Sequence, residues 1–438
     1  MTDSPRKGSL LVIFLTVFID LLGFGIVLPL LPIYGEHFAE QHQLTPAQVG
    51  WTIGLLMSSF SAMQFLFLPV WGRLSDHFGR RPILLMGLAG STFFYTMFGV
   101  ATSLGSLAGL FIARIGAGIF AATISTAQAY IADSTSKENR AKGMALIGAA
   151  FALGFTLGPL IGAASLLLGG EARFSPWPGY TAAALSGIAF LLAVFLLPES
   201  LSPGMRTAES RVPEGRAMWT ALRTPSIGLL IATSFITVFS FATFESSLSL
   251  QIKRMIGGHA GGDPLLNSLV ERVRAWGYTD EASIVNIIVL GGFAYLGIVL
   301  TLAQGVLVRR LATRLSEGTM ATLGAATAIA GFVGLAAAAT RGNFSLLLIA
   351  MAIEVIGFAF VNPSLQSLIS RRSDPKRQGG VLGLAQSATS LARILGPVFG
   401  LRVFAQSAAL LYWSAAGLMA LGLLMIIAAV RSGTDYPA

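Results

Sequence analysis

The chain contains no cysteine, few histidines and little charge. Because cysteine is absent, disulfides and thiol chemistry are excluded, and the redox compartment stays open. The four histidines lie in predicted loops, without a nucleophile motif or a phosphate-binding loop nearby. We therefore expect no enzymatic activity, no metal site and no cofactor.

Charged residues make up 11% of the 438 residues, against roughly 25% in a soluble domain, whereas hydrophobic residues make up 54%. Apolar runs long enough to cross a membrane recur along the chain. We count twelve, at about 8–32, 49–71, 82–101, 106–132, 142–168, 180–197, 226–252, 283–308, 319–339, 344–370, 379–404 and 410–430. The sequence therefore predicts an all-α membrane protein with twelve transmembrane helices. The first run is not a cleaved signal peptide, because it carries Asp20 and leads into further membrane segments.

Positive charge is concentrated on one side of this predicted topology. If both termini are cytoplasmic, the cytoplasmic segments hold 20 of the 29 Lys and Arg residues and the external segments hold 7. Cytoplasmic loops of membrane proteins prefer positive charge. We therefore place both termini in the cytoplasm. The basic pI of about 10.2 follows from this topology and does not indicate nucleic-acid binding.

The sequence indicates two halves of similar design. The only long cytoplasmic connection, 198–225, is rich in Pro, Ser, Glu and Arg, which is typical of a flexible linker. It would join an N-terminal six-helix bundle, 1–197, to a C-terminal six-helix bundle, 226–438. Internal similarity supports this division, since Leu157–Gly162 recurs as Leu395–Gly400, 238 residues later.

Five ionisable residues interrupt the apolar runs, although each costs roughly 2.5–3.5 kcal/mol at the centre of a membrane helix. They lie in runs one, four, seven, ten and eleven and are Asp20, Arg114, Glu245, Glu354 and Arg393. Such groups face the protein interior or a water-filled cavity and mark transport pathways. We therefore expect a functional or gating role for this set.

Asp20 and Arg114 lie at similar depth, about 18 Å from the inner boundary and about 14 Å from the outer one at about 1.5 Å per residue. Burial favours the protonated form of a carboxylic acid, whereas a nearby guanidinium favours the charged form. Our hypothesis is that Asp20, tuned by Arg114, couples proton entry to substrate exit. The alternative is a static ion pair that merely holds two helices together.

Glu245 and Glu354 are candidate substrate-contacting residues. Gln128 and Gln366, which lie 238 residues apart near the inner ends of their runs, are two more. Glu245 lies toward the outer end of its run, so a position at the external interface is the alternative. For Arg393 we expect a structural or gating role. Three acids against two bases within the spans favour cationic or neutral amphiphiles over anions.

The short connection between the second and third runs is dense in charge. It reads GRLSDHFGRR, and its candidate gating residues are Gly72, Arg73, Asp76, Gly79, Arg80 and Arg81. A related triplet begins at Arg310, 237 residues after Arg73, but Thr313 stands where Asp76 would. The arginines alone are also explained as topology signals. The spacing closely resembles the helix 2–3 signature of the major facilitator superfamily.

Further motifs extend this resemblance over nearly the whole chain, to the twelve-helix drug:proton antiporters of the tetracycline-efflux-like branch. The segment from Asp20 to Pro32 is similar to their first-helix signature, and Arg114–Gly118, continued by Ala129–Asp133, is similar to their helix-four motif. The helix-five antiporter motif is represented by Gly154, Gly158, Pro159 and Gly162. Ordinary small-residue packing is the alternative for this last motif.

The resemblance implies two pseudo-symmetric bundles, a central cavity and alternating access. It also implies proton-coupled export of small amphipathic molecules, and with it antibiotic resistance, by a monomer in a bacterial inner membrane. In the family, Arg80 would pair with Asp133, and Asp76 would dock at the start of helix eleven. Where tetracycline exporters carry an acid in helix three, this chain has Phe94, so a tetracycline–metal chelate is not the expected substrate. The alternatives are a nutrient importer or uniporter and a non-transporting receptor.

The external connection 253–282 is long. Asp263-Pro264 is typical of a helix N-terminus, apolar residues follow at helical spacing, and Gly277 is a stop signal. This pattern predicts a short amphipathic helix at the outer surface. An unstructured loop is the alternative.

Overall fold

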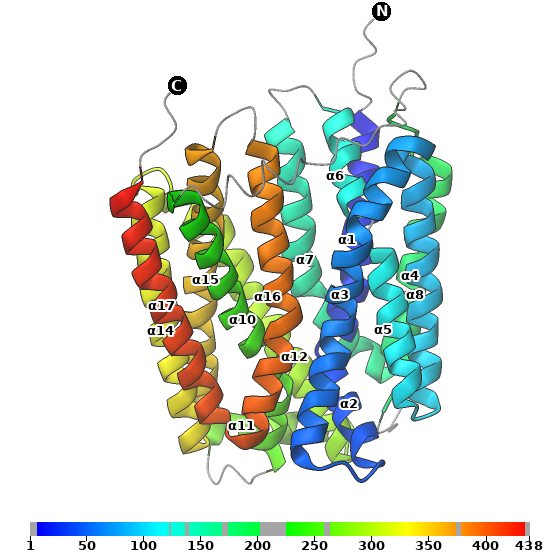
Figure 1. Ribbon diagram of the computed structural model, residues 1–438. Helices are drawn as coiled ribbons and strands as arrows, with labels where there is room; N and C mark the ends of the chain where they lie inside the picture. The colour runs from blue at the N-terminus through cyan, green and yellow to red at the C-terminus, as the bar shows by residue number, and fades with distance from the viewer. Residues whose placement is uncertain are drawn as a thin grey trace, which may run out of the picture. The chain divides into compact units, whose positions relative to one another are not determined.

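The computed structural model describes residues 7–121, 124–135, 140–168, 174–201, 225–257, 263–373 and 378–433. Within these ranges the regular structure is helical, and no strand occurs (Figure 1). In chain order the helices are α1 (Lys7–Val27), α2 (Leu31–Glu40), α3 (Pro46–Phe78), α4 (Arg80–Ser103), α5 (Leu107–Ala121), α6 (Ile124–Asp133), α7 (Arg140–Leu167), α8 (Trp177–Leu196), α10 (Pro225–Gly257), α11 (Pro264–Ala275), α12 (Glu281–Leu302), η2 (Ala303–Val308), α13 (Arg309–Leu311), α14 (Glu317–Arg341), α15 (Phe344–Arg372), α16 (Gln378–Gln406) and α17 (Ala408–Ser432).

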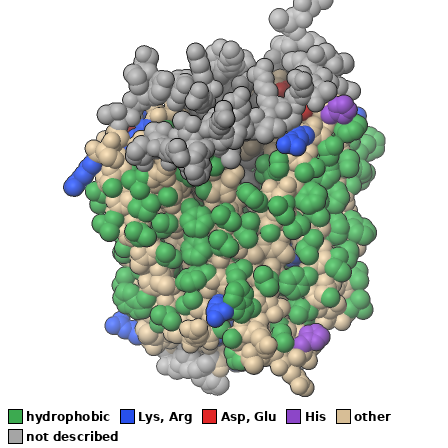
Figure 2. Space-filling view, in the orientation of Figure 1, with side chains coloured by type: hydrophobic (Ala, Val, Ile, Leu, Met, Phe, Trp, Pro, Cys, Tyr) green, Lys and Arg blue, Asp and Glu red, His purple; other side chains and the backbone are tan. Residues whose placement is uncertain are grey.

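The helices confirm an all-α integral membrane protein. In the described part of the chain, eleven helical segments are long and apolar enough to cross a membrane, and a shorter apolar helix, Leu153–Leu166 within α7, occupies the position of the predicted fifth span. The first span combines α1 with α2, and the fourth combines α5 with α6. On the face drawn in Figure 2, hydrophobic side chains cover most of the described surface, and Lys, Arg and His lie mainly near the helix ends.

The chain forms two compact units, which differ in part from the two predicted bundles. The first comprises Met1–His42, Ser59–Arg211 and Val273–Gly297, and the second comprises Gln43–Ser58, Val212–Arg272 and Ile298–Ala438. The start of α3 thus belongs with the C-terminal helices, and most of α12 belongs with the N-terminal ones. Of the predicted linker, the structure describes 198–201 and Pro225, because 202–224 lie outside the described residues.

Close contacts at glycines explain why the start of α3 belongs to the second unit and most of α12 to the first. A Cβ atom at Gly54 of α3 would lie 2.8 Å from the Cα of Val398 in the second unit. In the first unit, a Cβ atom at Gly297 of α12 would lie 2.6 Å from the Cα of Thr156. Membrane helices associate without a hydrophobic driving force, so close backbone packing at small residues decides which helices stay together.

The connection 253–282 contains the predicted helix, α11, and one carboxylate caps it. Asp263 accepts hydrogen bonds from the backbone N–H groups of Leu265 (3.0 Å) and Leu266 (3.1 Å). The same carboxylate accepts the N–H of Ser345 (3.0 Å), in the first turn of α15, and is contacted by the Ser345 hydroxyl at 3.3 Å. Burial raises the pKa of Asp263, but the hydrogen bonds from Ser345, Leu266 and Leu265 outweigh it and hold the pKa below its usual range. One side chain therefore ties α11 to the N-terminus of α15.

We predict that Asp263→Ala lowers the free energy of unfolding by about 1–2 kcal/mol, because helix N-termini lose their acceptor. A carboxyl group with a depressed pKa stabilises the fold above its unfolded pKa and loses this effect as the pH falls through the folded pKa. The difference between wild type and variant should therefore shrink below about pH 4. Thermal unfolding in detergent across this pH range measures it. Glu271→Gln, an exposed carboxylate on the same helix, is the control and should change little.

Candidate functional site

A polar cluster lies within the membrane-spanning part of the first unit. Asp20 of α1 accepts a hydrogen bond from the hydroxyl of Ser91 on α4, and its Oδ1 atom is buried without a hydrogen-bond partner. Tyr95, one turn after Ser91, lies within electrostatic range of both Asp20 and Arg114. Its ring packs on Gly23, where an added Cβ would lie 2.8 Å from the ring carbon Cε2. Asp20 therefore faces the neighbouring helix α4 rather than lipid.

Arg114 of α5 does not pair with Asp20. The two side chains are described, and no ion pair joins them; Nε and Nη1 of Arg114 are buried without hydrogen-bond partners. The guanidinium carbon instead lies 4.4 Å from the ring centroid of Phe60 and 5.8 Å from that of Phe24. The interpretation of a static Asp20–Arg114 pair is therefore wrong, because aromatic faces hold the cation through cation–π attraction.

The helix-four motif explains how the ring reaches the cation. Gly118 lies one turn after Arg114 on α5, and a Cβ atom there would lie 2.9 Å from the Cα of Phe60 on α3. The glycine lets α3 approach α5 closely and sets the Phe60 ring beside the guanidinium. Phe24 joins the ring group, with its centroid 5.2 Å from that of Phe60 and 5.8 Å from that of Phe155 on α7.

The helix-five motif packs against the helix that carries Asp20. A Cβ atom at Gly158 of α7 would lie 2.7 Å from the Cα of Gly25 on α1, and one at Gly154 would lie 2.9 Å from the Cβ of Leu21. Pro159 lies within α7 beside these contacts. The motif thus serves close helix packing. A role of the motif as a seal against ion leak stays a prediction.

Three of the five intramembrane charges form a cluster in the second unit. Glu354 of α15 is fully buried, and neither carboxylate oxygen has a hydrogen-bond partner. It lies in a tight crossing with α14, since a Cβ atom at Gly331 would be 2.5 Å from its Cα. Glu245 of α10 lies within electrostatic range of both Glu354 and the exposed Arg393 of α16. In this structure Glu354 is therefore out of reach of solvent.

A stacked ring pair accompanies the two acids. Phe241 and Phe358 lie with their ring centroids 3.9 Å apart and their planes 15° from parallel. Phe241 precedes Glu245 by four residues on α10, and Phe358 follows Glu354 by four on α15. Residues four apart share a helix face, so each acid has a stacked ring as its neighbour.

Gln128 of α6 and Gln366 of α15 are both exposed. Their exposure leaves them available to a substrate. A role for them in substrate binding stays a prediction.

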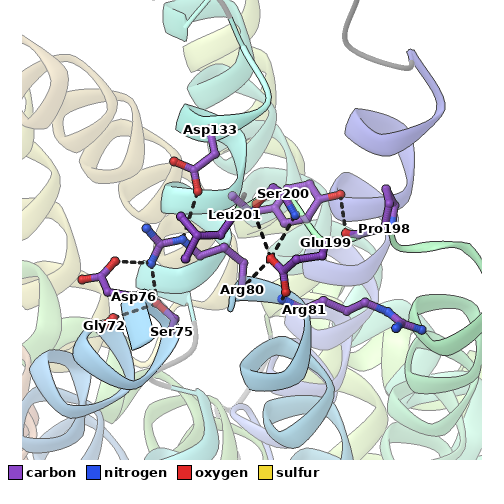
Figure 3. A network of polar contacts seen from close by, with 11 residues as sticks. Gly72, Ser75, Asp76, Arg80, Arg81, Asp133, Pro198, Glu199, Ser200 and Leu201 are labelled. Carbon is purple, nitrogen blue, oxygen red and sulfur yellow. Dashed lines mark hydrogen bonds and ion pairs between the residues drawn. The ribbon is translucent and has the colours of Figure 1, made fainter. Parts of the chain in front are cut away.

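The charged connection between α3 and α4 forms a network at the helix ends (Figure 3). The Arg80 guanidinium donates from Nε to Asp133 (3.0 Å), and its Nη1 contacts Asp76 (2.5 Å) and Ser75 (2.6 Å). Arg81 donates to the carbonyl of Val194 on α8 at 2.6 Å. The expected Arg80–Asp133 pair is present. Its role in gating stays a prediction.

Glu199, which the sequence did not single out, completes this network. Its Oε1 accepts the N–H of Arg80 (2.9 Å) and its Oε2 accepts the N–H of Arg81 (3.2 Å), the first residues of α4. Oε1 also accepts the N–H groups of Ser200 and Leu201 at 2.9 and 3.0 Å. A carboxylate at a helix N-terminus satisfies free donors and complements the helix dipole. The only sequence signal was an acid directly after the last span of the first half.

Two of the remaining candidate gating residues, which lie near the end of α3, are open to solvent or lightly packed. Arg73 is exposed, and no atom lies within 4 Å of a Cβ built on Gly72. The expected docking of Asp76 involves the start of α16, which adjoins residues 374–377 outside the described residues. That docking stays a prediction.

The second unit carries a related ion pair with its charges exchanged. Glu317, the first residue of α14, pairs with Arg371 near the end of α15 at 2.9 Å. The residue numbers exceed those of Arg80 and Asp133 by 237 and 238, the offsets of the internal repeat. Arg80 of the first unit thus corresponds to Glu317 of the second, and Asp133 corresponds to Arg371. An internal sequence comparison misses this correspondence because no residue is identical.

Buried charges on a bundle of membrane helices, with duplicated ion pairs at the helix ends, define a membrane transporter of small molecules. The sequence model of the Major Facilitator Superfamily matches residues 13–397 and again 278–435. The chain therefore belongs to the major facilitator superfamily, and is a transporter rather than an enzyme.

The chain is similar to curated members of this superfamily along most of its length. It is 33% identical to the tetracycline resistance protein, class C, of Escherichia coli, covering 92% of this chain and 91% of that protein. It is 30% identical to the major facilitator superfamily domain-containing protein 10 of Bos taurus, covering 90% and 87%. Among solved structures, the human organic anion transporter MFSD10 (TETRAN) matches with a TM-score of 0.67 at 23% identity, over 97% of this chain and 100% of that chain.

We predict that Gly79→Ala destabilises the protein by about 1–3 kcal/mol, because only glycine adopts such a backbone conformation readily. Gly79 has φ of +106°, and an added Cβ would meet the Glu199 carboxylate. Thermal unfolding in detergent measures the effect. Gly72→Ala is the matched control, since nothing lies within 4 Å of its Cβ position. Equal melting temperatures for the two variants would contradict the role of Glu199 as the cap of α4.

Proposed function

We propose that this protein is a proton-coupled exporter of small amphipathic molecules, with Asp20 as the proton carrier. The observation that carries this proposal is the buried Asp20 carboxylate, which has Ser91 as a hydrogen-bond donor but no ion-pair partner. An ionised carboxylate without a counter-charge is costly in a membrane interior. Its protonation therefore depends on whether it faces water, and that changes as a transporter alternates between its two open states.

The Arg80 network supplies a means of controlling that alternation. It joins α3, α4 and α6 to the segment after α8 through the side chains of Arg80, Asp133 and Glu199. We infer that these contacts stabilise the state closed to the cytoplasm and must break when it opens. By the distribution of Lys and Arg, both termini are cytoplasmic. We further infer a monomer in a bacterial inner membrane.

Two observations bear on the substrate. The tetracycline resistance relatives support a drug-like substrate, and three acids against two bases within the spans favour cations or neutral amphiphiles. A second candidate is transport of organic anions, because the similar human MFSD10 structure is that of an organic anion transporter. The buried nitrogens of Arg114 that lack hydrogen-bond partners favour this candidate, because an anion would satisfy them. A nutrient importer and a non-transporting receptor are weaker alternatives.

We predict that Asp20→Asn abolishes substrate movement driven by a pH gradient and leaves substrate binding measurable. Asparagine keeps the size and the contact with Ser91 but cannot exchange a proton. Purified protein in liposomes with an imposed pH gradient, assayed with tetracycline and with cationic, neutral and anionic aromatic compounds, measures both properties. Glu271→Gln, outside the membrane, is the control. Gradient-driven transport that persists in Asp20→Asn would refute the proposal.

A further inference from the structure

The aromatic surroundings of Arg114 resemble a receptor for a cation. Two rings lie beside the guanidinium, those of Phe24 on α1 and Phe60 on α3, and the ring of Phe155 on α7 packs against Phe24. We call these three rings the aromatic box. Ring faces bind organic cations, and the attraction grows when water is excluded. Arg114 is 2% exposed, so this contact lies out of water.

The box is next to the proton carrier. Asp20 and Phe24 are four residues apart on α1, so they lie on one helix face about 5–6 Å apart at their Cβ atoms. A cation on the ring of Phe24 would therefore lie within one helical turn of the carboxylate. Phe24 and Phe155 are only partly buried, so packing does not close the box on all sides.

We propose that Arg114 and a lipophilic cationic substrate occupy the aromatic box in turn, and that the charge of Asp20 decides between them. This inference rests on the proposed function and adds the substrate class and the subsite. When Asp20 releases its proton, the carboxylate attracts the guanidinium away from the rings, and the substrate cation takes its place. When Asp20 takes up a proton, Arg114 returns to the rings and displaces the substrate. The structure, with Arg114 on the rings and unpaired from Asp20, has the arrangement of the proton-loaded state.

Few other charges can influence this exchange. Tyr95 of α4 lies within electrostatic range of Asp20, and it also lies within range of Arg114 of α5. Helix α8 contains no Asp, Glu, Lys, Arg or His, and the charged residues of α7 are Arg140 and Lys142, in its first turn. Because α1 packs against α7 and α8, the opposite side of the helix adds no charge. The pH dependence of binding should therefore follow Asp20.

The test measures binding of tetraphenylphosphonium and tetraphenylborate, two ions of similar shape and opposite charge, to purified protein in detergent. We expect wild type to bind the phosphonium, and more tightly at alkaline than at acidic pH. Phe60→Leu should weaken its binding about tenfold, whereas Phe60→Tyr, which keeps the ring, should not. Phe24→Leu is a second variant in case Phe60→Leu fails to fold. Phe93→Leu removes an exposed ring elsewhere on the first unit and should have no effect.

Two further variants separate competition from packing. Asp20→Asn should bind the phosphonium weakly at every pH, because Arg114 stays on the rings. Asp20→Asn combined with Arg114→Gln should restore binding, because the box is then empty, and Phe60→Leu should cancel this restoration. A double variant as weak as Asp20→Asn alone, or a wild type that binds no phosphonium, overturns the inference.

Tetraphenylborate tests the alternative that Arg114 binds anions. If wild type prefers tetraphenylborate and Arg114→Gln abolishes that preference, Arg114 binds anions and the cation subsite is refuted. None of these measurements needs a gradient, so they are independent of the liposome assay. Suppose that Asp20→Asn loses gradient-driven transport, while both Phe60→Leu and Phe24→Leu bind the phosphonium as wild type does. The proposed exporter would then be supported, and the aromatic box would be refuted as a substrate subsite.

Discussion

The unpaired guanidinium of Arg114 is the constraint on which the first unit depends. A buried cation without a carboxylate partner is tolerated only if other groups compensate its charge. Here the rings of Phe60 and Phe24 do so. Gly118 is required for this arrangement, because a larger residue would separate α5 from α3 and withdraw Phe60 from the cation. The helix-four motif therefore both packs α5 against α3 and places the Phe60 ring beside the Arg114 cation.

The two halves of the chain share a plan but distribute their chemistry differently. The first unit keeps Asp20 apart from Arg114, each with its own uncharged neighbours. The second unit brings Glu245 within electrostatic range of both Glu354 and Arg393. At the helix ends the ion pair is retained with its signs exchanged. The two halves thus share the position of this ion pair along the chain, while the acid and the base change places.

Sequence patterns predicted much of the site, including the Arg80–Asp133 pair, but not the surroundings of the intramembrane charges. Apolar runs and the Gly-Arg-Arg connection indicated the family, and Asp263-Pro264 indicated α11 with its cap. The same reasoning left a static pair of Arg114 with Asp20 open as an alternative, because it weighed depth and charge but not the aromatic faces between neighbouring helices. It also passed over Glu199, since a single acid after a membrane span has no distinguishing pattern. Its partners lie 118 and 119 residues earlier in the chain.

The sequence by itself indicated the apolar helices and the ionisable residues within them, because hydropathy is a local property of the chain. Tertiary structure alone decided which groups surround each intramembrane charge. Glycine contacts at Gly118, Gly158 and Gly331 set the distances between helix axes, and these distances select the neighbours of each ionisable group. The assignment of α3 and α12 residues to the two compact units is likewise a matter of backbone contact, which no periodicity in the chain records.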